Sequence, residues 1–241
     1  MSLKRRAVLF GGALVFSLSI LLGIALTLGI AWPNLEAALY FTKWTSAPLH
    51  GLECPFFLTA AQGDVIQLTV KNPTPRTLQV RAQATFSRTI FREESQTIEL
   101  SPGAKGQIVW PVSAEDVDWG LFAFADVLLF PIASEPFRQA NCGILYLDIP
   151  WLSGRQVYAL ALGICLAGIL GGLVMVWANP PRSRRGQEVE RWMRVLSVIV
   201  LMALLVSSLG MWFFGIILLA ATVLMVSMFL YLLVSQSDSA G

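Results

Sequence analysis

The chain has 241 residues, of which 56% are hydrophobic and only 13% are charged, and its formal net charge is +2. Because soluble domains are about a quarter charged, this balance predicts a membrane protein surrounded by the lipid bilayer. The small net charge and the lack of a basic stripe with interleaved aromatic residues argue against a nucleic-acid partner.

The first apolar segment runs from Ala7 to Trp32 without an ionisable residue. Since a helix needs about 20 apolar residues to cross the hydrocarbon core, we expect a basic cytoplasmic start and a transmembrane helix within residues 1–32. A secretory signal peptide has a similar pattern, and Gly29-Ile30-Ala31 offers small residues for its cleavage. The apolar run is longer than a signal core of about 7–15 residues, which favours an uncleaved anchor.

Residues 33–152 alternate short strand-like runs with turn signals such as Ser101-Pro102-Gly103. The runs that predict strands lie at 64–70, 78–86, 97–100, 107–110, 121–130 and 143–149. Several short strands separated by turn residues are typical of an antiparallel β-sandwich. Residues 33–48 join it to the first apolar segment, either as a helix lying at the membrane interface or as a simple linker.

The order of these runs resembles that of immunoglobulin-like and fibronectin-type modules. The stretches that carry the resemblance are GDVIQLTVKN at 63–72, Ser101-Pro102-Gly103 and GLFAFADV at 120–127. The sequence departs from antibody-type domains because it lacks their cysteine–tryptophan–cysteine spacing. The resemblance implies a β-sandwich, as found on many cell surfaces.

Two of the three cysteines, Cys54 and Cys142, lie near opposite ends of this region. An extracytoplasmic compartment permits disulfides, and a bridge between them would close a long loop. We expect this disulfide, with two buried free thiols as the alternative. Cys165 lies in the next apolar segment and is expected to be a small packing residue.

The second long apolar segment, Gln156 to Trp177, predicts a transmembrane helix within residues 153–177, followed by a basic cytoplasmic loop at 178–194. Residues 195–234 carry no charge and would form about 60 Å of helix, about twice the thickness of a bilayer core. We therefore expect two transmembrane helices joined at Ser207-Ser208-Leu209-Gly210, and a tail at 235–241. The complete prediction is four transmembrane α-helices plus one extracytoplasmic antiparallel β-sandwich.

Basic residues set the orientation, because short cytoplasmic loops carry an excess of Lys and Arg. The residues expected on the cytoplasmic side are Lys4, Arg5, Arg6, Arg182, Arg184, Arg185, Arg191 and Arg194. Both termini are then cytoplasmic, and residues 33–152 lie outside. Proline excludes Asn72-Pro73-Thr74 as a glycosylation site, which favours a bacterial plasma membrane.

Small residues recur every four positions in the second apolar segment, a spacing that lets helices approach closely in lipid. They are Ala159, Gly163, Ala167 and Gly171, with Gly168 and Gly172 forming a G-x-x-x-G beside them. This pattern predicts packing either among the chain's own helices or against a membrane protein partner.

The sequence offers little catalytic chemistry. The single histidine, His50, has no neighbouring ligands and predicts a turn residue rather than a metal site. Glu115, Asp116 and Asp118, with Asp126 nearby, could bind calcium, but Ser113 indicates a capped helical turn instead. Because recognised nucleophile, phosphate-loop and metalloprotease motifs are missing, we expect no catalytic residues, no cofactor and no enzymatic activity.

These features favour a non-catalytic accessory or scaffold subunit of a membrane complex, whose external sandwich recognises a protein or a glycan. The alternative is a small transporter or channel component with helices lined by hydroxyl groups. The apolar segments lack the ionisable residues that usually mark ion routes. Hydroxyl-bearing residues remain, namely Ser17, Ser19, Thr27, Ser197 and Thr222.

Overall fold

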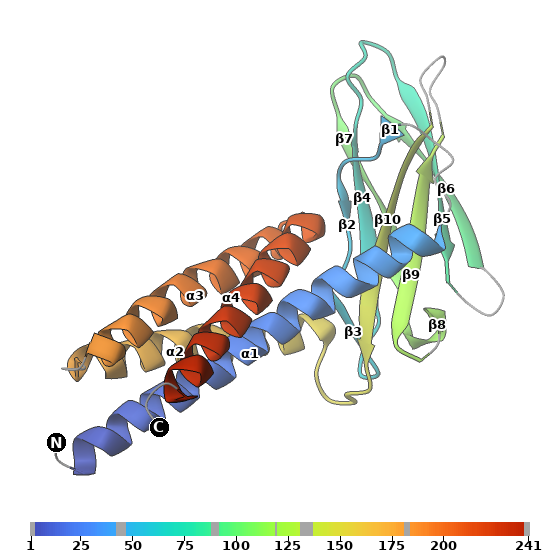
Figure 1. The fold of residues 1–241 in the computed structure, drawn as a ribbon. Coiled ribbons are helices and arrows are strands. Elements are labelled where there is room, and N and C mark those ends of the chain that lie inside the picture. The colour runs from blue at the N-terminus through green and yellow to red at the C-terminus, as the bar shows by residue number, and fades with distance from the viewer. Residues whose placement is uncertain are drawn as a thin grey trace. The chain divides into compact units, whose positions relative to one another are not determined.

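The alternating segments form ten short strands in two sheets of a computed structural model, which describes residues 3–41, 47–87, 92–118, 120–130, 137–180 and 184–238. The first sheet has the strand order β1 (Ala47–Pro48), β10 (Arg138–Leu147), β9 (Phe122–Leu129), β5 (Leu78–Phe86) and β6 (Arg92–Leu100). β3 (Phe57–Thr59) also pairs with β10, and β8 (Val117–Asp118) pairs with β9. The second sheet consists of β2 (Leu52–Glu53), β4 (Asp64–Lys71) and β7 (Lys105–Val112) (Figure 1).

The core lies between the two sheets, where alternate side chains of each strand point inward. In β5, Val80, Ala82, Ala84 and Phe86 are all fully buried, as the alternation in the sequence predicts. Trp110 of β7 joins them from the second sheet in one continuous cluster of buried residues. The strands expected at 64–70, 78–86 and 143–149 are therefore present as β4, β5 and β10. β10 begins five residues earlier than predicted, at Arg138.

The predicted purely antiparallel sandwich is wrong, because β1 and β3 both run parallel to β10. The first edge of the domain is divided among three short strands: β1 pairs with the start of β10, β2 pairs with β4 of the other sheet, and β3 returns to the end of β10. Strands of only two or three residues carry too little alternation to show this pairing in the sequence.

The opposite edge of the sandwich is closed by side chains instead of a strand ladder. Gln96 of β6 donates a hydrogen bond from Nε2 to the Val109 carbonyl of β7 at 2.9 Å. Arg92 donates from Nη2 to the Pro111 carbonyl at 2.7 Å. Pro111 also lacks a backbone N–H group. The two occupied carbonyls and this missing donor leave fewer backbone groups of β7 available for pairing with another strand at this edge.

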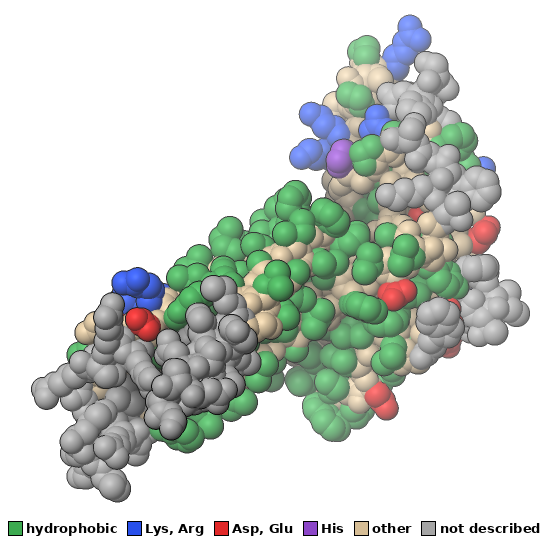
Figure 2. Space-filling model, in the orientation of Figure 1, with side chains coloured by type: hydrophobic (Ala, Val, Ile, Leu, Met, Phe, Trp, Pro, Cys, Tyr) green, Lys and Arg blue, Asp and Glu red, His purple; other side chains and the backbone are tan. Residues whose placement is uncertain are grey.

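A second unit of the chain is helical and comprises residues 1–31 and 159–241, whereas residues 32–158 form the sandwich unit. Its helices are α1 (Leu3–Tyr40), α2 (Gly154–Ala178), α3 (Arg184–Ser208) and α4 (Trp212–Asp238), of which α1 and α2 extend into the sandwich unit. α3 and α4 form the expected hairpin, and Gly210 at its turn has φ +79°, a value that favours glycine. Hydrophobic side chains cover much of the visible face of the helical unit (Figure 2).

The prediction of four transmembrane helices is also wrong. Among the described residues, two helices are long and apolar enough to cross a membrane, Phe10–Tyr40 and Gly154–Ala178. The turn at Gly210 divides the uncharged run into two shorter parts. The uncharged part of α3 begins at Val195 and ends at Ser208, and the described apolar part of α4 is Trp212–Ser227. Each is shorter than the about 20 residues that span a bilayer core.

Candidate binding site

The end of α1 is packed on the outer face of the first sheet. The expected interfacial helix or linker at 33–48 is instead a continuation of α1 through Pro33 to Tyr40. Pro33 and Ala37 are buried, and the Asn141 side chain of β10 donates a hydrogen bond to the Ala37 carbonyl at 3.3 Å. Tyr40 donates to the Asp118 carboxylate at 3.2 Å. These contacts hold the last turns of α1 on β10 and β8.

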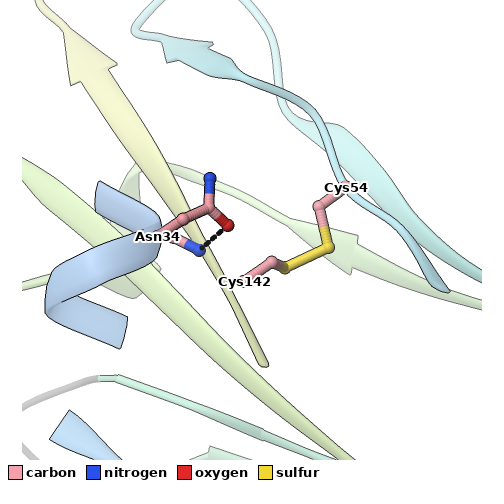
Figure 3. Close-up of a disulfide and its surroundings, with 4 residues drawn as sticks. Asn34, Cys54 and Cys142 are labelled. Carbon is pink, nitrogen blue, oxygen red and sulfur yellow. Dashed lines mark hydrogen bonds between the residues drawn. A yellow bond between two sulfur atoms is a disulfide. The ribbon is translucent and has the colours of Figure 1, made fainter. Parts of the chain in front are cut away.

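Gly143 allows this close packing, because a Cβ atom there would collide with the Pro33 carbonyl. Its backbone N–H donates to Oδ1 of Asn34 at 3.4 Å, the contact shown as a dashed line in Figure 3. The helix backbone and the strand backbone therefore meet directly. A residue with a side chain at position 143 would push α1 away from the sheet.

The predicted disulfide between Cys54 and Cys142 is confirmed, with its Cα atoms 6.5 Å apart and a sequence separation of 88 residues. It joins the loop after β2 to the middle of β10, next to Asn34 of α1 (Figure 3). A loop of this length corresponds to about 4–5 kcal/mol of stabilisation in the chain-entropy description. The bridge thus fixes the divided first edge of the sandwich to its last strand.

The start of α2 is held by β3 and by its own cap. A Cβ atom at Gly154 would collide with the Phe57 carbonyl, and Thr59 donates from Oγ1 to the Leu152 carbonyl at 2.7 Å. Ser153 donates from its N–H to Oε1 of Gln156 at 2.9 Å, which completes a capping arrangement. These contacts hold the first turn of α2 against β3 within the sandwich unit.

A cavity of about 330 Å³ lies between the loop after β2, strand β4 and the first turn of α2. The side chains that give it chemical character are Glu53, Phe56, Phe57, Gln67, Arg155 and Tyr158. Its volume is at the lower end of the about 300–1,000 Å³ that is usual for small-ligand pockets. Local sequence patterns could not predict this site, because its residues come from three separate segments of the chain.

The acidic cluster has a structural role. The Ser113 cap is confirmed: its side chain accepts from the Glu115 N–H, and the Asp116 carboxylate accepts from the Ser113 N–H at 3.0 Å. Asp116 is fully buried and forms an ion pair with Arg92 at 3.3 Å. Asp118 accepts the hydrogen bond from Tyr40 described above.

Asp126 of β9 has a perturbed acidity. Burial raises the pKa of Asp126 from 3.8 to about 6, although hydrogen bonds from Gln139 favour its ionised form and oppose the shift. Both carboxylate oxygens lie 2.9 Å from Gln139 Nε2. No group of three or more His, Cys, Asp or Glu side chains in the described parts of the chain could hold a metal ion, and His50 is exposed.

The hydroxyl groups of the helices mostly bond within their own helix. The donors that bond to the carbonyl four residues earlier are Ser19, Thr27, Ser197 and Thr222. Ser17 is exposed. Hydrogen bonds of this kind satisfy each hydroxyl locally, so these residues do not require a polar path through the helices.

The small residues of α2 lie on two different faces. A Cβ atom at Gly172 would lie 2.7 Å from Phe16 Cβ and 2.9 Å from the Gly12 carbonyl of α1, and one at Gly168 would collide with Ser19. Gly163 and Gly171 would meet nothing within 4 Å, and Ala159 and Ala167 are exposed. Gly168 and Gly172 thus pack against α1. The stripe of small residues at positions 159, 163, 167 and 171 lies on a more open face of α2.

Of the eight basic residues expected on the cytoplasmic side, the structure describes the side chains of Arg191 and Arg194. Arg194 forms an ion pair with Glu190 and lies over the Trp177 ring at 5.4 Å, and Arg191 is exposed beside it. Arg182 lies outside the described residues. The same holds for the side chains of Lys4, Arg5, Arg6, Arg184 and Arg185.

Comparison with known proteins finds no matching model of a protein family and no matching curated protein. Among solved structures, a β-glucuronidase of Bacteroides uniformis is 14% identical, with 38% of this chain covering 12% of the enzyme at a TM-score of 0.30. A β-glucosidase of Erythrobacter marinus is 15% identical over 42% of this chain and 15% of that enzyme, with a TM-score of 0.28. A β-glucosidase of Listeria innocua is 12% identical over 45% of this chain and 17% of its own, with a TM-score of 0.29. These partial likenesses support no inference about activity.

Proposed function

We propose that this protein is a non-catalytic accessory or scaffold subunit of a membrane complex, with a sandwich that recognises a protein or a glycan. Its anchors are α1 and α2, the two helices with sufficient length and apolar character to span a bilayer. The observation that carries the proposal is the attachment of both anchors to the sandwich, through Gly143 on β10 and Gly154 on β3. An attachment of this kind suits a recognition module that is tied to the membrane at two points of the chain.

We place the sandwich outside the cytoplasm of a bacterial cell and both termini inside it. The Cys54–Cys142 disulfide supports this orientation, because such bonds persist in oxidising compartments. Arg191 and Arg194 lie in the first half of α3, the helix that follows α2 in the chain, and such an excess of basic residues is typical of cytoplasmic segments.

The partners of the acidic side chains support a non-catalytic role. Asp116 is committed to a helical cap and to Arg92, Asp118 accepts from Tyr40, and Asp64 is paired with Arg155 at 2.9 Å. These three carboxylates therefore stabilise the fold. A general acid or base would need a carboxylate aimed at a reacting group.

The orientation is tested with single cysteines at two exposed positions. Ser95→Cys on β6 should react with a membrane-impermeant maleimide in intact cells, whereas Gln187→Cys on α3 should react only after permeabilisation. Both residues are exposed, so accessibility within the protein is matched. The reverse labelling pattern would invert the proposed topology.

The accessory role is tested by crosslinking in cells and native purification in a mild detergent. A defined partner should co-purify with the wild type and be lost from the Gly163→Leu/Gly171→Leu double variant, which fills the open stripe of α2. Gly11→Leu is the matched control, because nothing lies within 4 Å of that glycine on α1 either. A chain that is always recovered alone contradicts the proposal.

A further inference from the structure

The cavity beside the disulfide has an uneven charge distribution. Arg155 donates from Nε to Oδ2 of Asp64 at 3.2 Å and from Nη2 to Oδ1 at 2.9 Å, so its charge is balanced by a two-point ion pair. Glu53 also lines the cavity, and its carboxylate forms no hydrogen bond or ion pair with the described residues. The two carboxylates and one guanidinium leave the site with a single negative charge, carried by Glu53.

Glu53 is fixed by the strand pairing at the edge of the second sheet. It lies opposite Gln67 in the antiparallel pair of β2 and β4, and Gln67 lines the same cavity. The next residue along the chain, Cys54, is held by the disulfide. A carboxylate and a carboxamide oxygen are thus presented together by backbone that is restrained on both sides.

Aromatic rings form another wall of the cavity. The Tyr158 ring lies 5.2 Å from the Phe56 ring at an angle of 60° and 6.1 Å from the Phe57 ring at 37°. The faces of such rings attract cations, and aromatic residues combined with a carboxylate are a recurring arrangement for binding ammonium groups. The negatively polarised faces of the same rings would disfavour an anion.

We infer that this cavity binds a small organic ammonium group, such as that of a choline or ethanolamine moiety, with Glu53 as its counter-charge and Tyr158 with Phe56 as its aromatic wall. The volume suits a headgroup of this size rather than an extended chain. The inference goes beyond the proposed accessory role, and it concerns this chain in isolation.

Two sources could supply this chemistry, a soluble amine or the headgroup of a phospholipid. The lipid source rests on the proposed membrane role, because Arg155 and Tyr158 lie in the first turns of α2, one of the two apolar helices. A lipid in the surrounding bilayer would then reach the cavity without leaving the membrane surface.

The test uses the full chain in a maltoside detergent, which lacks ammonium groups, with choline as the titrant in calorimetry. We expect saturable binding that is weakened about fivefold by Glu53→Gln and about threefold by Tyr158→Leu. Glu99→Gln removes the same charge from an exposed glutamate on β6, away from the cavity, and should leave the affinity for choline unchanged. Methyl phosphate serves as the anionic probe and should not bind at this site.

Nanodiscs separate the two sources. If a lipid headgroup occupies the cavity, choline binding is retained in phosphatidylglycerol discs and lost in phosphatidylcholine discs; equal binding in both identifies a soluble amine as the ligand. The inference is overturned if choline does not saturate in detergent, if wild type and Glu53→Gln bind equally, or if methyl phosphate binds more tightly than choline. These results leave the partner-capture experiment unaffected, so the two proposals fail separately.

Discussion

The helical unit and the sandwich unit place the same kinds of apolar residue in opposite positions. Phe10 and Leu224 of the helices are 72% and 70% exposed, whereas Trp110 and Phe86 of the sandwich are fully buried. The sandwich is therefore organised by removal of apolar surface from water, and the helical unit by close approach of backbones at glycine. This exposure of apolar side chains is what the proposed membrane location of the helical unit would require.

Polar side chains show the same contrast. In the sandwich, Asn72 is fully buried and its Nδ2 donates to the carbonyls of Arg76 at 2.8 Å and Leu100 at 2.9 Å, linking separate segments. In the helices, Thr27 and Ser197 bond to carbonyls of their own helix. The buried amide of the sandwich unit thus links separate segments, whereas these hydroxyl groups of the helical unit form hydrogen bonds only within their own helices.

The largest expected effect on stability comes from removing the disulfide of the sandwich unit. Replacing both Cys54 and Cys142 with serine should lower the free energy of unfolding of the sandwich by about 4 kcal/mol, because the 88-residue loop is no longer closed in the unfolded state. Denaturant unfolding of the full chain in detergent, followed by near-UV circular dichroism, measures this loss. Cys165→Ala in α2 is the control and should leave the sandwich transition unchanged.

Gly143→Ala tests the packing of α1 on β10. We expect a loss of about 3 kcal/mol in the sandwich transition, since the new methyl group would collide with the Pro33 carbonyl and backbone must move. Gly163→Ala, where nothing lies within 4 Å, should leave that transition unaffected. Equal stability of the two variants would show that α1 is not held on the sheet.

Neighbouring glycines of α2 test the packing within the helical unit. Gly172→Ala should destabilise this unit by about 1 kcal/mol, because its Cβ atom would lie 2.7 Å from Phe16 Cβ. Gly171→Ala should instead stabilise it by about 0.5 kcal/mol, since the space is open and alanine favours the helix. Thermal unfolding followed by far-UV circular dichroism distinguishes the two, and a gain for both would contradict the packing.

The effect expected at Asp126 depends on pH. Because burial raises the pKa of Asp126 from 3.8 to about 6, its ionisation costs stability, and this cost appears between about pH 4 and pH 6 and persists above. Asp126→Asn should therefore stabilise the sandwich by about 1 kcal/mol at pH 8, after allowance for solvent screening, and leave it unchanged at pH 4. Thermal denaturation at both pH values is the measurement. A gain of equal size at both would exclude titration of this group.

Local patterns in the sequence predicted much of the sandwich. The alternation along 78–86 and the turn at Ser101-Pro102-Gly103 suffice to locate strands, because burial repeats every second residue. The Cys54–Cys142 pairing followed from the cysteine positions and the expected compartment. The start of β6 at Arg92 was missed because its charged residues obscure the alternation.

Contacts between distant segments were not predictable from the sequence. The first helix was expected within residues 1–32, yet α1 continues through Pro33 to Tyr40, where packing on β10 outweighs the N–H group that proline lacks. Within this continuation Leu39 is 74% exposed, and Ala37 makes the buried contact with the sheet. The cavity was missed for the same reason, since Glu53 and Tyr158 are far apart in the chain.

The side-chain bonds from Gln96 and Arg92 to the β7 carbonyls have a consequence for crowding. Neighbouring copies held at high local density could polymerise by adding strand to strand along such a border. Here the carbonyls of Val109 and Pro111 already accept hydrogen bonds, so an incoming strand would first have to displace the side chains of Gln96 and Arg92. Copies of this domain can therefore stand side by side without growing into fibres along that border.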